Sequence, residues 1–401
     1  MEIIEIFLSI LSLIMAYLLG AILPAFLFGK LKGIDIREEG DKNPGTTNAF
    51  HVLGLPLAIL TAIYDTLKGL LAMLFAFILG VNLIIWQICG LLAIIGHVFP
   101  FYLRFRGGQG NATATGLLLF YLVNYLTVSF DLFYVLLFLL VLVVIFTYIS
   151  KAGSLLPVIL FPVLGYSVFI FYPNSGLNLF FVLILVHIGT IGMYKVITEK
   201  KLVITDERFL SHWWRVAIRP VSLLFLIFVH MDHTFGLYLI GIVCLCFIAL
   251  DLLRFIHKST NILLTEKVKA IFRKGEEQRF SSMTIFLIST FIIVLFFEIE
   301  IATTALVFLV FTDMFGKIFG LAYGRHKIFE KTLEGTLACF GSVIISGFIL
   351  YTSLDIPLIV LIAGGIAAPL IELLPIGIND NFTVPIISGA VMTAIKFFLV
   401  L

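Results

Sequence analysis

Two stretches of polar residues, separated by apolar segments, have the composition of a site that binds a phosphate group. They cover residues 36–51 and 96–113, and both combine glycines with Thr, Asn and Arg. Glycine-rich turns leave backbone N–H groups able to point at an anion, above all at a helix N-terminus. Arg104 and Arg106 add positive charge. The pattern favours chemistry on a phosphate monoester; for either stretch alone, a plain connecting turn with arginines at the lipid headgroups is the simpler alternative.

Between these stretches lies a pair of opposite charges inside an apolar segment. Asp65 and Lys68 are three residues apart, which places them on one face of a helix. Charges inside a membrane helix are costly and are usually functional, or at least paired with each other. Because the pair lies between two polar stretches on the same side of the membrane, it favours a functional site over simple turns.

A second group of polar residues lies in the C-terminal part of the chain and has the outline of a nucleotide site. Asp313 and Asp380 can hold Mg²⁺, which prefers oxygen ligands and shares them with phosphates. Glycines and cations that can surround a polyphosphate lie nearby: Gly316, Lys317, Gly320, Arg325 and Lys331. The Walker A pattern is absent, which excludes an ordinary P-loop kinase. Interfacial loops with a solvated basic face are the alternative, and Arg273, Lys274 and Glu276 fit it at least as well.

Composition places these polar stretches in a membrane protein. The 401 residues are 61% hydrophobic and 12% charged, whereas soluble domains have about 25% charged residues. The net charge of +2 and the lack of a basic tail argue against a nucleic-acid partner. The four cysteines lack the spacing of metal ligands or of a disulfide framework. We therefore expect an all-α polytopic membrane protein that contacts membrane lipids.

Apolar segments long enough to cross a bilayer recur along the whole chain. They predict about fourteen transmembrane helices in two seven-helix halves, with domains at residues 1–200 and 201–401. The predicted spans are 3–29, 55–80, 82–102, 112–128, 132–149, 154–172, 178–196, 214–231, 235–253, 283–297, 299–316, 336–352, 356–374 and 384–401.

The distribution of charge predicts how these spans are oriented. All Lys and Arg except Lys68 and Lys396 lie in, or at the helix ends beside, the loops that follow odd-numbered spans. The positive-inside rule makes these loops cytoplasmic and places the N-terminus outside. We expect the plasma membrane, with both groups of polar loops facing the cytoplasm.

The first half resembles the bacterial family of acyl-phosphate:glycerol-3-phosphate acyltransferases over nearly its whole length. The resemblance rests on the runs at 36–51, 65–69 and 96–113. The matching residues are Asn43, Gly45, Thr47, Asn48, Asp65, Lys68, Gly69, Gly96, His97, Phe99, Pro100, Gly107, Gly108, Gly110 and Thr113. It implies a seven-span fold that transfers an acyl group from acyl-phosphate to glycerol 3-phosphate. His97 is then the expected catalytic residue. The expected substrate-binding residues are Asn43, Gly45, Thr47, Asn48, Asp65, Lys68, Arg106, Gly107, Gly108 and Gly110.

Several positions depart from the pattern of that family. Asp41 stands in place of Ser, His51 in place of Arg, Gln109 in place of Lys, and Thr190 in place of Asn. Lost cations remove charge-assisted contacts to phosphate, each worth about 1.5–3 kcal/mol. An added carboxylate at Asp41 repels a dianion. The first half is therefore either active as its family is, active on another acceptor, or inactive.

The second half resembles the CTP-dependent lipid kinases, a family that includes dolichol kinase and phytol kinase. The resemblance rests on the runs at 271–284, 313–320, 331–336 and 380–385, with Arg215, Asp251 and Arg254 as a weaker start. It implies transfer of the CTP γ-phosphate to a lipid alcohol with Mg²⁺. Asp313 and Asp380 are the expected catalytic and metal-binding residues. The expected nucleotide-binding residues are Gly316, Lys317, Gly320, Lys331, Glu334, Gly335 and Asn381.

Three hypotheses follow for the whole chain. In the first, both halves are transferases of lipid metabolism, one an acyltransferase and one a lipid kinase. In the second, only the kinase half is active. The third is a lipid transporter or scaffold, which is disfavoured because we find no internal repeat and the polar residues gather at one face. The sequence gives neither the lipid acceptor nor the oligomeric state.

Overall fold

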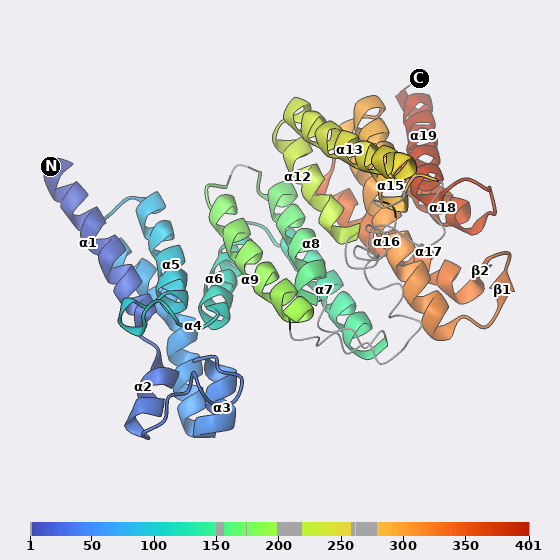
Figure 1. Ribbon diagram of the computed structural model, residues 1–401. Coiled ribbons are helices and arrows are strands. Elements are labelled where there is room, and N and C mark those ends of the chain that lie inside the picture. Colours follow the sequence, from blue (N-terminus) through green and yellow to red (C-terminus); the bar gives the residue numbers. More distant parts are fainter. Residues whose placement is uncertain are drawn as a thin grey trace. The chain divides into compact units, whose positions relative to one another are not determined.

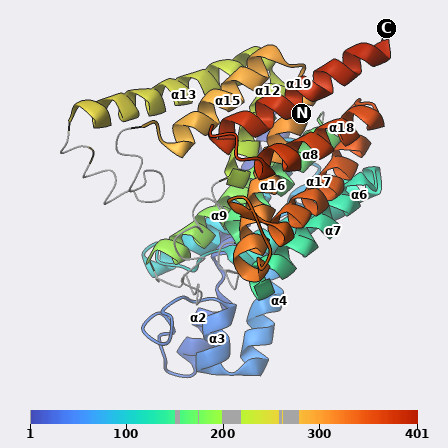
Figure 2. The same ribbon diagram turned by 90° about the vertical axis from the view of Figure 1, so that its right-hand side faces the viewer.

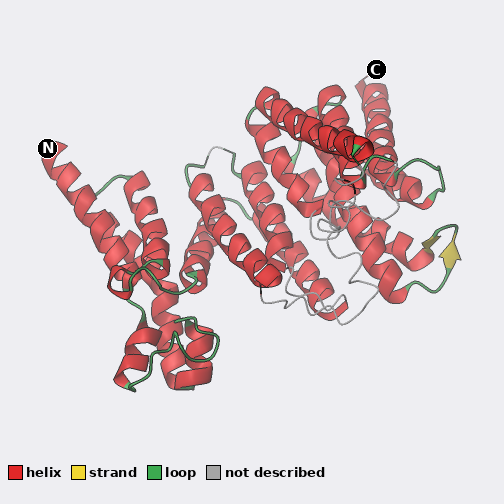
Figure 3. Cartoon of the chain, in the orientation of Figure 1, coloured by secondary structure: helices red, strands yellow, loops and turns green. Residues whose placement is uncertain are grey.

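The computed structural model describes residues 2–149, 156–173, 175–198, 219–257, 261 and 279–400. Within these ranges the regular structure consists of helices and one short hairpin, joined by loops, as expected for an all-α protein (Figure 3). It forms two compact units, Met1–Phe130 with Asn174–Glu199, and Asp131–Pro173 with Lys200–Leu401. Residues 131–173, predicted as part of the first domain, thus group with the second unit. Each unit is described by itself.

The first unit is built around one long helix, α4. Its elements are α1 (Glu2–Ala21), α2 (Pro24–Leu31), α3 (Thr46–Leu53), α4 (Leu55–Ile78), α5 (Leu83–Val98), η1 (Phe101–Leu103), α6 (Asn111–Val128) and α9 (Asn178–Thr198). Helix α4 packs against α1, α5 and α6, and α2 and α3 lie beside it as well (Figure 1). Segment 3–29, predicted as one span, is two helices, because Pro24 has no N–H to continue the ladder of α1 and instead starts α2.

Glycines allow the helices of this unit to approach at backbone distance. A Cβ on Gly20 in α1 would lie 2.3 Å from the carbonyl oxygen of Ala93 in α5, and one on Gly96 would lie 2.3 Å from that of Tyr17. A Cβ on Gly116 in α6 would lie 2.0 Å from the carbonyl oxygen of Thr66 in α4. Small residues at such contacts are the usual means of packing helices in a membrane. They hold α1, α5 and α6 at fixed positions around α4.

The second unit surrounds a buried helix, α16 (Ile299–Tyr323), with every residue from Ile301 to Phe315 buried. The other elements are α7 (Asp131–Val144), η2 (Ile145–Ile149), α8 (Leu156–Phe171), η4 (Arg219–Ser222), α12 (Leu223–Met231), α13 (His233–Ile256), α15 (Ser282–Phe296), β1 (Lys327–Ile328), β2 (Lys331–Thr332), α17 (Leu333–Ser353), α18 (Leu358–Leu373) and α19 (Asp380–Val400). Helices α13, α15 and α19 follow one another side by side (Figure 2). The antiparallel hairpin β1–β2 pairs Ile328 with Lys331 and leads the chain from α16 into α17.

Apolar helices of membrane-spanning length establish a multi-pass membrane protein. In the part of the chain that the structure describes, nine helices are long and apolar enough to cross a bilayer. Five shorter apolar helices occupy the positions of the remaining predicted spans: Ile159–Phe171, Asn178–Tyr194, Arg219–Met231, Ser282–Phe296 and Leu358–Leu373. The total of fourteen stays a prediction, as does the orientation. Lys396, an exception in the charge pattern, forms an ion pair with Glu298.

The contact between Gly20 and Ala93 can be tested directly. We expect Gly20→Ala to destabilise the protein by about 1–3 kcal/mol, because its methyl group meets backbone atoms that cannot move aside. The measurement is the thermal unfolding midpoint in detergent. Gly176→Ala is the matched control, since a Cβ there meets nothing within 4 Å. Equal midpoints for the two variants would contradict the close approach of α1 and α5.

Candidate functional sites

Three charged or titratable side chains form the centre of a site in the first unit. Lys68 Nζ donates a hydrogen bond to Asp65 Oδ1 at 2.9 Å, and His97 Nδ1 lies 3.5 Å from the same oxygen. At most 3% of any of these side chains is exposed. Asp65 and Lys68 come from α4 and His97 from the last turn of α5. The predicted pairing of Asp65 with Lys68 is present, and His97 joins it.

This cluster lies where the neighbouring helices end. Lys68 Nζ also donates to the carbonyl oxygen of Ile22, just after the last residue of α1. Ile22 lies in the break between α1 and α2, and Lys68 supplies a donor to its carbonyl oxygen there. The first turns of α4, which precede the cluster in the sequence, lie beside α2 and α3. The charges therefore lie at the ends of α1 and α5, although they are well inside the sequence of α4.

The glycine loop after α5 folds back onto His97. The N–H of Gly107 donates to the carbonyl oxygen of Val98, and that of Gly108 donates to the carbonyl oxygen of His97, both at 3.0 Å. A Cβ on Gly108 would lie 2.2 Å from His97 Nε2. Only glycine leaves room for the imidazole ring at this position. The N–H groups of Gly107 and Gly108 are therefore engaged by the loop itself, and these glycines shape the surroundings of Nε2.

Anion-binding capacity lies at the next residues, where α6 begins. Gly110 has φ 75°, a left-handed conformation that favours glycine, and α6 starts at Asn111. The first N–H groups of a helix have no partners within it and favour negative charge. His187 Nε2 in α9 lies 3.0 Å from the carbonyl oxygen of Gln109, which holds this turn in place. Asn111 Oδ1 and Thr113 Oγ1 are buried there without a hydrogen-bond partner in the described chain.

The loop at 36–48 is held together by Asn48. Its amide donates to the carbonyl oxygens of Ile36 and Glu39, both at 2.9 Å, and its Oδ1 accepts from the N–H of Asp41 at 3.1 Å. All three bonds stay within the loop and its helix α3. Asn48 is completely buried. Its observed contacts are therefore structural, and its predicted role in binding substrate stays a prediction.

The other predicted residues of this loop are arranged around α3. Gly45 is the residue before α3, Thr47 is exposed and Asn43 is partly buried, with its N–H donating to Asp41 Oδ1 at 3.2 Å. Asp35 accepts two side-chain hydrogen bonds from Arg37, which lowers the pKa of the Asp35 carboxyl to about 2. The guanidinium of Arg37 is therefore occupied within its own loop.

Two of the positions that depart from the family pattern, His51 and Thr190, make contacts away from the ion pairs. His51 packs edge-on against Phe50 with ring centroids 5.3 Å apart, and Thr190 Oγ1 donates to carbonyl oxygens of its own helix α9. Arg106, predicted to bind phosphate, is exposed. None of these contacts involves Asp65, Lys68 or His97. The buried centre is therefore intact, and the changes affect its surroundings.

In the second unit, a polar cavity of about 500 Å³ opens beside α16. Its charged lining residues are Arg219, Arg279, Asp313, Lys317, Glu330, Lys331 and Asp380. Asp313, one turn before Lys317 on α16, forms ion pairs with Lys317 and with Arg219 Nη1, the latter at 2.8 Å. Asp313 and Arg219 are buried. The structure thus brings together Asp313, Lys317, Lys331, Asp380 and Asn381, as the sequence pattern predicts.

Lys331 connects the hairpin to α18 and α19. Its Nζ lies 2.6 Å from Glu372 Oε1 and 2.8 Å from Asp380 Oδ2. Burial lowers the pKa of Lys331, but the two carboxylates outweigh this and raise it above its usual value. The ammonium group stays charged at physiological pH and holds both acidic side chains at the cavity.

Asn381 holds three elements of the second unit together. Its Oδ1 accepts from Arg219 Nη2 at 2.7 Å, and its Nδ2 donates to the carbonyl oxygen of Ser282 at 2.9 Å. Its own carbonyl oxygen accepts from Ser289 Oγ at 2.7 Å. The side chain therefore fixes η4, the start of α15 and the start of α19 around the cavity. Whether it also contacts a nucleotide stays a prediction.

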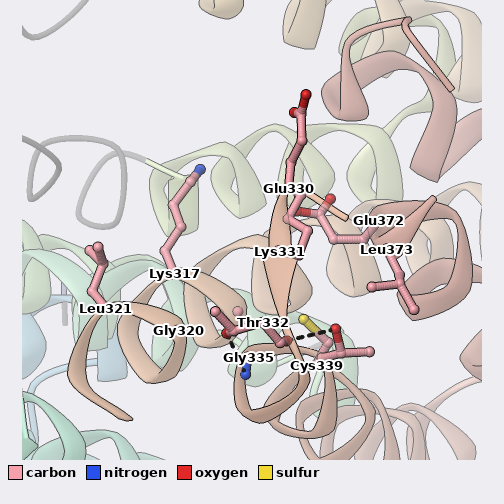
Figure 4. A pocket seen from close by; sticks show the side chains of 12 residues that line it. Lys317, Gly320, Leu321, Glu330, Lys331, Thr332, Gly335, Cys339, Glu372 and Leu373 are labelled. Carbon is pink, nitrogen blue, oxygen red and sulfur yellow. Dashed lines mark hydrogen bonds and ion pairs between the residues drawn. The ribbon is translucent and has the colours of Figure 1, made fainter. Parts of the chain in front are cut away.

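A second cavity of about 270 Å³ adjoins the polar one and shares Lys317, Glu330 and Lys331 with it. Gly316, Gly320 and Gly335 line it, with Cys339 and Glu372 (Figure 4). A Cβ on Gly335 would lie 2.9 Å from the carbonyl oxygen of Gly316. The glycines therefore let α16 and α17 approach closely at one wall of this cavity.

Other sequence predictions for this unit have different outcomes. Glu334 lines neither cavity; its carboxylate contacts His326 Nδ1 at 2.7 Å and steadies the hairpin. Arg219 was missed, because one arginine among many at the ends of polar loops carries no distinctive signal. Glu372, three residues before Pro375, also lines the glycine-lined cavity. Arg215, Arg273, Lys274 and Glu276 lie outside the described residues.

The Mg²⁺ site predicted at Asp313 and Asp380 can be compared with these contacts. Across the described ranges, no group of three or more His, Cys, Asp or Glu side chains is arranged to hold a metal ion. Asp313 is paired with Arg219 and Lys317, and Asp380 with Lys331. In this arrangement both carboxylates are paired with protein cations. The metal role stays a prediction, and no step below depends on it.

Together these features define a multi-pass membrane protein with a buried His–Asp–Lys cluster beside a glycine-rich loop. Residues 10–199 match the family described as glycerol-3-phosphate acyltransferase. Glycerol-3-phosphate acyltransferase 2 of Bacillus anthracis is 42% identical over 157 residues, which are 38% of this chain and 77% of that protein. The chain therefore belongs to the glycerol-3-phosphate acyltransferase family, whose members are transferases.

Two further relatives are matched over shorter lengths, and one solved structure is matched over a longer one. Glycerol-3-phosphate acyltransferase 1 of Deinococcus radiodurans is 44% identical over 27% of this chain, and the chain spans 56% of its length. The Bacillus subtilis glycerol-3-phosphate acyltransferase is 46% identical over 28% of this chain and 58% of its own. The crystal structure of PlsY (YgiH), an integral membrane glycerol 3-phosphate acyltransferase, in its glycerol 3-phosphate form has a TM-score of 0.36 and 28% identity, covering 49% of this chain and 92% of that one. The kinase resemblance of residues 201–401 stays a prediction.

The buried Asp65–Lys68 pair can be tested for its contribution to stability. We expect Asp65→Asn to cost about 3–5 kcal/mol, because it leaves the Lys68 ammonium buried without a counter-ion. The double variant Asp65→Asn with Lys68→Met removes both charges and should regain most of that loss. Thermal unfolding in detergent measures both effects. A double variant at least as unstable as the single one would contradict the pairing.

Proposed function

We propose that the first unit transfers an acyl group from an acyl-phosphate to a hydroxyl of glycerol 3-phosphate. Family membership supports the reaction class. The observation that carries the proposal is the geometry around His97, whose Nδ1 lies 3.5 Å from Asp65 while a Cβ on Gly108 would meet Nε2. A histidine oriented by a carboxylate on one nitrogen can act as a general base through the other.

In the proposed reaction, the hydroxyl oxygen of glycerol 3-phosphate attacks the carbonyl carbon of the acyl-phosphate. His97 Nε2 takes the hydroxyl proton, and Asp65 stabilises the imidazolium that forms. The bond between the carbonyl carbon and the phosphate oxygen breaks, and inorganic phosphate leaves. The free N–H groups at the start of α6, after Gly110, bind a phosphate group during this step. Lys68 keeps Asp65 ionised and in place.

The departures at Asp41, His51, Gln109 and Thr190 favour an alternative in which the acceptor differs or this unit is inactive. The cation positions of the family pattern carry His51 and Gln109, so the site has fewer charges for phosphate. Since the buried centre retains Asp65, Lys68 and His97, we place acyl transfer first.

The test of acyl transfer uses the purified full-length protein in detergent. We expect inorganic phosphate to be released from palmitoyl phosphate only when glycerol 3-phosphate is present. His97→Ala should reduce the rate about 10²–10⁴-fold, the usual effect of losing a general base. His233→Ala, a histidine of the other unit bound to the carbonyl oxygen of Val294, is the matched control and should keep the wild-type rate. Release that does not depend on glycerol 3-phosphate, or that survives in His97→Ala, would refute the proposal.

We propose for the second unit transfer of the γ-phosphate of CTP to the hydroxyl of a lipid alcohol. A specific observation supports it: Arg219, Lys317 and Lys331 line one polar cavity, and a glycine-lined cavity adjoins it. Cations clamped around a phosphate stabilise the charge of a phosphoryl-transfer transition state. CTP, accompanied by Mg²⁺ on its phosphates, would enter from the cytoplasm, in keeping with the predicted orientation of these loops in the plasma membrane.

Phosphoryl transfer can be followed with CTP labelled at the γ-phosphate. We expect label in the lipid fraction with dioctanoylglycerol or geranylgeraniol as acceptor, and more from CTP than from ATP. Asp313→Asn should lose most of this activity, because it releases Arg219 and Lys317 from their positions. Asp355→Asn, an exposed aspartate away from the cavity, is the control. Absence of labelled lipid with wild-type protein, or full activity in Asp313→Asn, would refute the kinase function.

A further inference from the structure

One carboxylate at the two cavities of the second unit has an oxygen for which the described part of the chain provides no hydrogen-bond donor. Glu372 Oε1 accepts from Lys331 Nζ at 2.6 Å, whereas Glu372 Oε2 is buried and has no hydrogen-bond partner in the described part of the chain. The side chain is 7% exposed and lines the glycine-lined cavity. A buried carboxylate oxygen without a donor is costly, so such an atom on a side chain that lines a cavity points to a ligand that supplies the donor.

The other acidic side chains at these cavities are placed differently. Asp313 is paired with both Arg219 and Lys317, so its charge is neutralised by two cations. Asp380 is bound to Lys331 and is 36% exposed. Glu330 is exposed at the rim shared by the two cavities. Glu372 therefore combines burial, a fixed orientation and a free oxygen.

The surroundings of Glu372 are suited to a hydroxyl on an apolar chain. The lining of the cavity includes Gly316, Gly320, Gly335, Leu321 and Leu373, and Glu330 is the one other carboxylate among the described residues that line it (Figure 4). Lys331 stands between this cavity and the polar one, because its Nζ contacts both Glu372 and Asp380. A phosphate in the polar cavity and a hydroxyl at Glu372 would therefore both lie next to Lys331.

We propose that Glu372 is the general base for the acceptor hydroxyl, which enters through the glycine-lined cavity. The inference rests on the proposed phosphoryl transfer. The hydroxyl oxygen attacks the γ-phosphorus of CTP, its proton passes to Glu372 Oε2, the bond from the γ-phosphorus to the bridging oxygen breaks, and CDP leaves. The products are a lipid phosphomonoester and CDP, and Glu372 returns its proton to water. Lys331 positions the carboxylate by holding Oε1.

The test compares Glu372→Gln with the wild type in the labelled-CTP assay with dioctanoylglycerol. Glutamine keeps the shape of the side chain and an oxygen for Lys331, but it accepts no proton. We expect kcat to fall about 10²–10⁴-fold with the KM for CTP unchanged. The fall in the wild-type rate towards acidic pH should be absent in the variant. Glu298→Gln is the matched control, because it also removes a carboxylate paired with a lysine, Lys396, outside the cavities.

Glu372→Asp separates catalysis from folding, because it keeps a carboxylate and should retain the acidic limb of the pH profile at a reduced rate. The inference is overturned if Glu372→Gln keeps the wild-type kcat, keeps the acidic limb, or loses activity through KM for CTP instead. A wild-type protein that labels no lipid from CTP overturns both the inference and the kinase function. An active wild type with an equally active Glu372→Gln overturns the inference alone.

Discussion

A charge in a membrane helix must be neutralised by a neighbour, and this requirement organises both units. Lys68 and Asp65 share one face of α4 and neutralise each other, with a carbonyl group at the end of α1 taking a further hydrogen bond from the lysine. In the second unit, Asp313 on the central helix is neutralised by Arg219 and Lys317. Removing one partner of such a pair leaves an uncompensated buried charge, which costs far more than the pair contributes. Each pair therefore fixes the helices that carry it.

The same constraint places the polar side chains where helices end. His97 joins Asp65 from the last turn of α5, and the glycine loop can fold onto its ring because Gly108 has no side chain. Lys331 likewise reaches Glu372 at the end of α18 and Asp380 at the start of α19. Helix ends supply unpaired backbone groups as well as side chains, which makes them suitable for anionic substrates. The two units reach this arrangement with different residues and different connections.

The sequence predicts the class of fold and much of each site, and the limits follow from the kind of contact involved. Apolar length and periodicity locate the helices, and the spacing of Asp65 and Lys68 predicts their pairing. Contacts between distant segments are not encoded in spacing. Arg219 meets Asp313 and Asn381 only through tertiary packing, and Asn48 is a motif residue whose bonds all stay within its loop. The break before Pro24 could have been predicted from the proline alone, because a proline in a helix interior has no N–H to donate.

The central claim is that the chain carries two sites that work independently, one in each unit. The most direct measurement assays both reactions on the same preparations of wild type, His97→Ala and Asp313→Asn, with folding checked by thermal unfolding. The account predicts that His97→Ala loses glycerol 3-phosphate-dependent release of phosphate but keeps phosphorylation of dioctanoylglycerol from CTP. Asp313→Asn should show the reverse. Loss of both activities in either folded variant, or loss of neither, would contradict two independent sites.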